Sequence, residues 1–183
     1  MDDRAALRAL LLQRSVRRGD FVLASGARSS YYIDARRTTM SGEGQRLIGR
    51  LGLEALRAAG WEPQAVGGLT LGADPVAYAI AHAAAASGSA IDAFTVRKEP
   101  KTHGTGRRIE GAFAPGMRVV VVEDVVTTGE SALRAVDAVR QEGGEVLGVL
   151  AVVDRGEGGR ERLAAAGLPL VSLFAAAELL ATG

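Results

Sequence analysis

Residues 117–131, MRVVVVEDVVTTGES, decide the fold of this chain. Four consecutive valines, Val119 to Val122, lead into two acidic residues, Glu123 and Asp124, and a short Thr/Gly turn follows. A β-branched run bounded in this way predicts a strand that is buried on both faces of a parallel sheet. Downstream, apolar residues at helical spacing end at a Gly-Gly pair, which predicts a helix. The stretch therefore predicts a buried strand, a turn and a helix in direct succession.

The turn after this strand carries the residue types of a phosphate site. Thr127, Thr128, Gly129 and Ser131 lie where the predicted helix begins. Backbone N–H groups at a helix N-terminus, together with hydroxyl donors and the helix dipole, can hold a phosphate dianion. The two acids would repel that phosphate, but they can accept hydrogen bonds from the vicinal hydroxyls of a ribose or lie near a magnesium ion. A sugar 5-phosphate fits both halves, and an ordinary βα turn with a solvated acidic pair is the alternative.

Length and composition limit the class of protein. The 183 residues predict a single domain over residues 1–183, with residues 1–40 as a small N-terminal hood packed on it. The formal net charge of +1 argues against a nucleic-acid binder or a membrane binder. The absence of cysteine excludes a disulfide scaffold and thiolate chemistry. Neither a signal peptide nor an apolar run of membrane-spanning length is evident, so we expect a cytoplasmic protein.

The rest of the chain alternates between strand and helix patterns. Besides the valine run, strands are predicted at 65–69, 91–96, 145–153 and 170–173, and helices at 41–59, 75–86 with Asp74 as N-cap, 160–166 and 175–181. A helix at 3–12 and two short strands at 20–23 and 31–33 would form the hood, which we expect to be a flap rather than a core layer. This order predicts an α/β fold with a mostly parallel sheet and helices on both of its faces.

A basic loop is predicted at residues 97–111, which contain five basic and two acidic residues. It contains Lys98 and Lys101, the only lysines of the chain, and His103. The charge suits a diphosphate and the glycines suit a lid, although a merely solvated loop is the alternative. Ligands of parallel sheets gather beyond the carboxyl ends of the strands, where this loop, the acidic turn, the glycine-containing loop at 68–72 and Arg155 would all meet.

The acidic turn resembles the phosphoribosyl diphosphate (PRPP) signature of the type I phosphoribosyltransferases. Over nearly its full length the chain resembles the orotate phosphoribosyltransferase family. The segments that carry this resemblance are SGARSSYYID (residues 25–34), RKEPKTHG (97–104), the PRPP turn and VVDR (152–155). The resemblance implies a type I phosphoribosyltransferase-like fold and the reaction of orotate with PRPP to give orotidine 5′-monophosphate and diphosphate, in pyrimidine biosynthesis. It also implies Mg²⁺, held mainly by PRPP and water with no direct metal ligand from the protein, and a homodimer that shares its lid.

The resemblance assigns roles to individual residues. The PRPP-binding residues would be Arg97, Lys98, Lys101, His103, Glu123, Asp124, Val125, Val126, Thr127, Thr128, Gly129, Glu130 and Ser131. The two acids would meet the ribose hydroxyls, the residues after them would surround the 5-phosphate, and the basic loop would hold the diphosphate. Orotate would contact Thr127 and Arg155. The candidates for catalysis are Lys101 and His103, which would stabilise the leaving diphosphate, and Asp124, which could move a proton.

Two departures from the family pattern and two rival functions stay open. Ala24 stands where many members carry lysine, and Glu123 replaces the commoner aspartate. One rival is a purine or other-base phosphoribosyltransferase on the same scaffold, and the other is a regulator that senses PRPP without turning it over. The segments at 25–34 and 152–155 argue against the first rival. The small net charge and the lack of a spare domain argue against the second.

Overall fold

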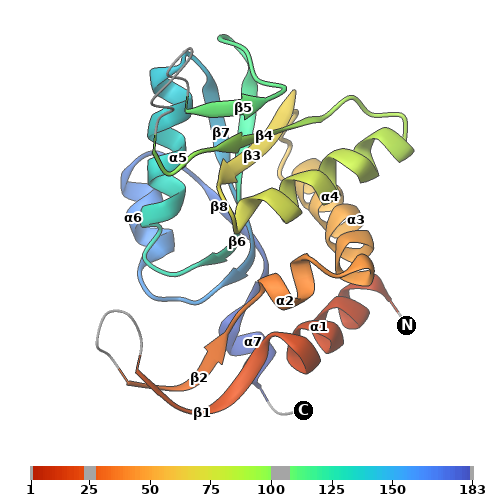
Figure 1. Cartoon of the computed structure of the whole chain (residues 1–183), viewed down its shortest axis with the longest axis vertical. Coiled ribbons are helices and arrows are strands. Elements are labelled where there is room, and N and C mark those ends of the chain that lie inside the picture. The colour runs from red at the N-terminus through yellow and green to blue at the C-terminus, as the bar shows by residue number, and fades with distance from the viewer. Residues whose placement is uncertain (1, 23–27, 100–107, 182–183) are drawn as a thin grey trace.

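The computed structural model describes residues 2–22, 28–99 and 108–181 (Figure 1). Its strands are β1 (Val16–Val22), β2 (Arg28–Ile33), β3 (Ala65–Leu69), β4 (Asp92–Val96), β5 (Ile109–Gly111), β6 (Arg118–Val126), β7 (Glu145–Asp154) and β8 (Leu170–Ala175). Its helices are α1 (Asp3–Arg14), α2 (Arg36–Thr39), α3 (Gly42–Ala58), α4 (Ala73–Ala86), α5 (Glu130–Gln141), α6 (Gly159–Ala165) and α7 (Ala176–Leu180). Within these described ranges, no helix is long and apolar enough to cross a membrane.

The main sheet has six strands in the order β5-β4-β3-β6-β7-β8. Every neighbouring pair is parallel except β4 and β5, which are antiparallel. The valine-rich strand β6 lies between β3 and β7, and all four of its central valines are fully buried. The predicted α/β fold with a mostly parallel sheet is therefore confirmed, and strand β6 is central as expected.

Helices cover both faces of this sheet, and the alternating side chains of β6 divide the core between them. Val120 and Val122 belong to a cluster with buried residues of α1, α3, α4 and α7. Val119 and Val121 belong to a second cluster with buried residues of α5 and α6. Because successive side chains of a strand point to opposite faces, the next two residues of β6, Glu123 and Asp124, must also diverge.

The N-terminal segment has two parts with different roles. Strands β1 and β2 form a separate antiparallel hairpin (Figure 1). From here on we use the name hood for this hairpin and α2 only, without the first helix. Helix α1 is different, because Leu7 and Leu11 are fully buried in the core cluster beside α3. The expectation that the whole N-terminal portion is a flap outside the core was therefore wrong for α1. Its leucine spacing predicted the helix but not the surface that it would cover.

Three arginines join the N-terminal segment to the C-terminal helix. Arg4 forms an ion pair of 2.7 Å with Glu178 and donates to the carbonyl of Leu173 at 2.5 Å. Arg8 donates to the carbonyls of Glu178 and Ala181 at 3.1 and 3.0 Å, and Arg18 of β1 donates to the carbonyl of Leu180 at 3.1 Å. These contacts satisfy carbonyls at the end of α7, where a helix has no backbone donors of its own. We call them the C-terminal tie.

Several element boundaries differ from the prediction. Helix α4 begins at Ala73, so Asp74 lies in its first turn and is not the N-cap. The Asp74 carboxylate instead accepts hydrogen bonds from Thr70 Oγ1 at 2.7 Å and Thr95 Oγ1 at 2.8 Å. The predicted loop at 97–111 ends in strand β5, and the short helix α2 was not predicted. Each of these differences depends on partners that are distant in the sequence or on elements of only three or four residues.

Candidate active site

Two hollows adjoin each other at the carboxyl end of β6. The first, which we call the α5 hollow, has a volume of about 320 Å³ and is lined by Glu123, Val125, Val126, Thr127, Thr128, Gly129, Glu130, Ser131, Ala132 and Arg134. The second, which we call the hood hollow, has a volume of about 340 Å³ and is lined by Tyr32, Ile33, Asp34, Ala35, Arg36, Leu69, Thr70, Leu71, Gly72, Lys98, Glu123, Asp124, Val125, Thr127, Ser131 and Arg155. Four residues line both, namely Glu123, Val125, Thr127 and Ser131. The hollows thus form one continuous site.

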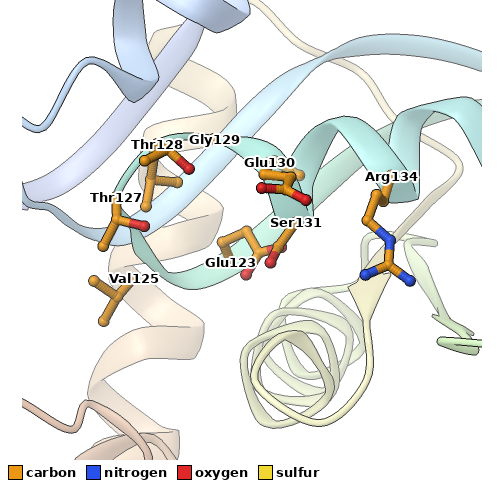
Figure 2. A pocket seen from close by; sticks show the side chains of 10 residues that line it. Glu123, Val125, Thr127, Thr128, Gly129, Glu130, Ser131 and Arg134 are labelled. Carbon is orange, nitrogen blue, oxygen red and sulfur yellow. The ribbon is translucent and has the colours of Figure 1, made fainter. Parts of the chain in front are cut away.

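The α5 hollow is built on the turn between β6 and α5. Strand β6 runs through Val126, so only Thr127, Thr128 and Gly129 separate it from the helix. Gly129 is the residue before the helix and has a φ of 77°, a conformation that glycine adopts without strain. Figure 2 shows the side chains of Glu123, Glu130 and Ser131 gathered where α5 begins. N–H groups of a first helical turn and three hydroxyl side chains give this hollow donors that can bind an anion.

Glu123 lies between the two hollows and is almost completely buried, with 5% of the residue exposed. Its Oε1 atom is buried without a hydrogen-bond partner among the described residues. Burial, followed by the neighbouring charge of Asp124, raises the pKa of the Glu123 carboxyl to about 8. A buried carboxyl oxygen without a donor is costly. The Glu123 carboxyl is therefore suited to a ligand that brings hydroxyl groups.

This pKa shift predicts how stability depends on pH. The folded protein holds the Glu123 proton more tightly than the unfolded chain, whose carboxyl titrates near 4.5. The contribution of Glu123 to the free energy of unfolding should therefore be largest below pH 4.5, decrease as pH rises toward 8, and level off above it. Glu123→Gln lacks this titration, while the other groups remain. We expect wild type to lose about 1 kcal/mol per pH unit relative to Glu123→Gln between pH 5 and 7.5.

Urea unfolding of both proteins at pH 5, 6 and 7.5 measures this difference. Asp124 titrates in both proteins, so its contribution largely cancels. A stability difference between the two proteins that stays constant over this range would show that Glu123 is already ionised at pH 5.

Asp124 faces the hood hollow, on the other side of β6. Its carboxylate lies so close to the loop after β3 that a Cβ atom on Gly72 would be 2.6 Å from Asp124 Oδ1. Burial raises the pKa of the Asp124 carboxyl, while the Val125 N–H, which donates to Oδ1 at 2.9 Å, and the charge of Arg36 oppose this rise. Alternation along β6 thus separates the two acids, so that Glu123 lines both hollows and Asp124 lines the hood hollow alone.

Arg155 is brought to the hood hollow by the end of β7. Its backbone N–H donates to the Val126 carbonyl at 2.9 Å, which joins the ends of β7 and β6. Only 7% of its side chain is exposed. The buried Asp154 before it accepts from Arg160 Nη2 at 3.0 Å and from the Gly156 N–H at 2.9 Å. These bonds fix the loop that carries the Arg155 guanidinium.

The structure places most of the predicted site residues together. The residues from Glu123 to Ser131 and Arg155 line the two hollows, as does Lys98. Arg97 does not line either hollow, and its guanidinium pairs with Glu110 at 2.9 Å. Lys101, His103 and Ala24 lie outside the described residues. The site therefore contains the two predicted acids of β6, the Thr/Gly turn and Arg155. Arg97 lies at the start of the basic loop, outside both hollows.

Sequence reasoning missed several residues that line the site. The hood contributes Tyr32, Asp34 and Arg36, with Arg36 Nε bonded to Asp34 Oδ1 at 2.9 Å. Helix α5 contributes Arg134, the one cationic side chain among the described residues that line the α5 hollow. Helical spacing from Ser131 could have identified Arg134, because residues three apart share a face. No sequence signal marked Arg36, since its position depends on the unpredicted helix α2.

The carboxyl side chains at the site also determine how the protein could bind a metal ion. Within residues 2–22, 28–99 and 108–181, no three His, Cys, Asp or Glu side chains form a group that could enclose a metal ion. Two carboxyls do stand at the site, and the unpartnered Oε1 of Glu123 is one of their oxygens. Mg²⁺ commonly binds through one or two carboxylates together with water and substrate phosphates. The residues present therefore fit a magnesium ion that arrives with a phosphorylated substrate.

Comparison with known proteins finds similarity over nearly the whole chain. Residues 41–166 match the family of the phosphoribosyl transferase domain. An orotate phosphoribosyltransferase from Aquifex aeolicus (strain VF5) is 52% identical over 183 residues, covering 98% of this chain and 99% of that protein. Mycobacterium tuberculosis H37Rv orotate phosphoribosyltransferase has a similar crystal structure in complex with Fe(III) dicitrate, with a TM-score of 0.88, 50% identity, and coverage of 98% of this chain and 100% of that one.

The same mycobacterial enzyme has also been crystallised in complex with 5-phospho-α-D-ribosyl 1-diphosphate. That structure has a TM-score of 0.83 and 49% identity to this chain, and the match covers 97% of this chain and 99% of that one. Coverage this complete includes the hood as well as the sheet.

Proposed function

We propose that this chain, which belongs to the orotate phosphoribosyltransferase family, transfers the 5-phosphoribosyl group from PRPP to orotate in the site formed by its two hollows. The products are orotidine 5′-monophosphate and diphosphate, and the reaction serves pyrimidine biosynthesis. The observation that carries this proposal is the continuity of the site. An anion site at the start of α5 and a buried arginine at the end of β7 stand on either side of the acidic pair of β6. A cytoplasmic location remains a prediction of the sequence.

The α5 hollow suits the 5-phosphate and the ribose of PRPP. Its turn from Thr127 to Ser131 offers backbone N–H groups and hydroxyls to the phosphate. Glu123 and Asp124 lie in β6 just before that turn, where they can accept hydrogen bonds from the ribose hydroxyls. Binding of hydroxyl donors favours the ionised form of Glu123, so we expect PRPP binding to release a proton near pH 7.

The hood hollow suits orotate, which carries a carboxylate. The buried guanidinium of Arg155 can pair with that carboxylate, and the Thr127 hydroxyl lines the same hollow. A purine lacks this carboxylate and would leave Arg155 without its anionic partner. The buried arginine therefore favours orotate over the rival base substrates.

The reaction breaks the bond between the anomeric carbon and the diphosphate oxygen and forms a bond from that carbon to the orotate ring nitrogen. Positive charge develops on the ribose and negative charge develops on the diphosphate. The chain's acids face the ribose, and we assign Lys98, Lys101 and His103 of the basic loop to the diphosphate. The orotate ring nitrogen loses its proton in this step, and the Asp124 carboxylate is our candidate to accept it. Alignment of the reactants between two fixed hollows lowers the entropic part of the barrier.

Mg²⁺ bound with PRPP would neutralise charge on the diphosphate, and Glu123 and Asp124 are the residues that would face it. We also propose a homodimer in which the basic loop of one protomer reaches the site of its partner. Two large apolar side chains near the site, Leu71 and Tyr78, are about half exposed and could be covered by a second copy.

One assay tests the proposed reaction. Purified protein with PRPP and Mg²⁺ should form orotidine 5′-monophosphate from orotate and no nucleotide from adenine, guanine or uracil at equal concentration. Nucleotide formation from a purine alone would favour the rival base-specific transferase. Binding of PRPP without any turnover would favour the regulator. The absence of orotidine 5′-monophosphate would refute the proposal.

Gly72→Ala should weaken PRPP binding without unfolding the chain. The φ of Gly72 is −65°, which alanine adopts readily, but the new Cβ would lie 2.6 Å from Asp124 Oδ1 and displace that carboxylate. We expect the KM for PRPP to rise about tenfold, the effect of losing one charged hydrogen bond. Gly42→Ala is the matched control, because a Cβ at Gly42 meets nothing within 4 Å. Equal KM values for the two variants would contradict the placement of Asp124.

A further inference from the structure

A buried arginine needs partners, and Arg155 has an unusual set of them. Its Nη2 atom lies 2.7 Å from Oε1 of Glu157, a side chain that is 36% exposed. The Arg155 Cζ atom lies 5.1 Å from the centre of the Tyr31 ring, which the hood supplies. The Arg155 Nε atom is buried and has no hydrogen-bond partner among the described residues. One carboxylate and one aromatic ring therefore contact the guanidinium, and its Nε donor has no partner among the described residues.

The loop after β7 is folded so that Glu157 faces Arg155. Gly156 and Gly158, on either side of Glu157, have φ values of 69° and 85°, a conformation that glycine adopts without strain. The two ends of this loop are joined by the bond between Asp154 and Arg160 at 3.0 Å. Arg160 also donates to the Leu170 carbonyl of β8 at 2.6 Å. The frame around Glu157 is thus rigid, although Glu157 itself lies at the surface.

We propose that Glu157 is a positioning residue for the base site, an inference that rests on the proposed function. It holds the Arg155 guanidinium against Tyr31, so that the remaining N–H donors face the orotate carboxylate in the hood hollow. The guanidinium has five donors in a fixed plane, and an anchor at Nη2 sets the direction of all the others. The opposite role, a competitor that occupies Arg155 until orotate displaces it, would require Glu157 to cover the donors that face the ligand. In the structure Glu157 pairs with Nη2, while the buried Nε has no partner among the described residues, so we favour the anchoring role.

The kinetic constants of Glu157→Ala distinguish these roles. Loss of the anchor should raise the KM for orotate about tenfold, while kcat and the KM for PRPP change less than about twofold. Glu157→Gln keeps the size of the side chain and one carbonyl acceptor, so it should raise the KM for orotate only about threefold and thus partly restore the wild-type value. Glu161→Ala on α6 is the control, because Glu161 is exposed and loses the same charge four residues away. We expect it to behave as wild type.

Other outcomes overturn the inference. A lower KM for orotate in Glu157→Ala would show a competitor, and an unchanged KM would show no role. Equal increases in the KM values for orotate and PRPP, or loss of kcat alone, would show a general structural effect. If Glu157→Ala does not fold, Glu157→Gln carries the test with the same criteria. Failure of wild type to convert orotate would remove the proposed function itself, and this inference with it, whereas an active wild type with indifferent variants removes only the inference.

Discussion

Arg155→Met should raise the KM for orotate about 100-fold while leaving the KM for PRPP within about threefold of wild type. Only 7% of the Arg155 side chain is exposed, and the loss of a buried charged hydrogen-bond partner costs about 2–5 kcal/mol, or roughly 30- to 5,000-fold. We place the effect near the lower end, because Glu157 is partly exposed and water can solvate it once the guanidinium is gone. The substituted methionine fills similar volume, so the fold should persist.

Steady-state kinetics with varied orotate measure this change in KM. Two further variants test whether the effect is specific to the Arg155 guanidinium. Arg155→Lys keeps a charge but lacks the planar fork that matches a carboxylate, so an intermediate loss of about tenfold is expected. Arg162→Met, on the exposed side of α6, removes an arginine of the same loop region outside both hollows. If Arg155→Met and Arg162→Met gave the same KM for orotate, Arg155 would have no part in binding the base.

Lys101→Ala should lower kcat by about 100- to 1,000-fold with little change in the KM for orotate. This prediction rests on the sequence, since Lys101 itself lies outside the described residues. The structure describes both ends of its segment, where the Arg97 N–H donates to the Arg108 carbonyl at 2.8 Å and Lys98 lines the hood hollow. A cation held at the leaving diphosphate acts mainly in the transition state, where the loss of one such donor typically costs about this much. A kcat within twofold of wild type would remove Lys101 from the mechanism.

Mixing two impaired variants, assayed at an orotate concentration well below the KM of Arg155→Met, tests whether the loop acts across a dimer. In a mixed dimer of Lys101→Ala and Arg155→Met, one site would combine an intact Arg155 with an intact Lys101 from its partner. Random exchange should then restore about a quarter of the wild-type activity. If each loop serves its own site, no mixed dimer has a complete site, and the mixture should show only the residual activity of the two variants.

The central strand and its acids could be predicted from the sequence because their signals are local. Val119 to Val122 contact the core on both faces, and any exposed position there would have interrupted the valine run. The true end of β6 could not be predicted in this way. Val125 pairs with Val153 and Val126 pairs with Asp154 on β7, so two residues expected in the turn are strand residues. Pairing with a distant strand has no local signal.

The base end of the site was the least predictable part. Arg155 was found from its resemblance to a family motif, but Tyr31 and Glu157 reach it from the hood and from a loop between two glycines. Asp74 shows the same limitation, because its carboxylate accepts from Thr95, 21 residues away, instead of capping its helix. Side-chain partners of this kind depend on the assembled fold, and the spacing of residues along the chain does not reveal them.

The C-terminal tie connects the last helix to the hood, which lines the hollow that we propose binds the base. The hood supplies the Tyr31 ring beside Arg155, and Arg18 on β1 fastens that hood to the carbonyl of Leu180. Of the described residues after Phe174, which end at residue 181, none lines either hollow. Shortening the C-terminal tail, or fusing a bulky tag close to these carbonyls, would therefore weaken the proposed binding of orotate, although the hood that contacts Arg155 belongs to the N-terminal end of the chain.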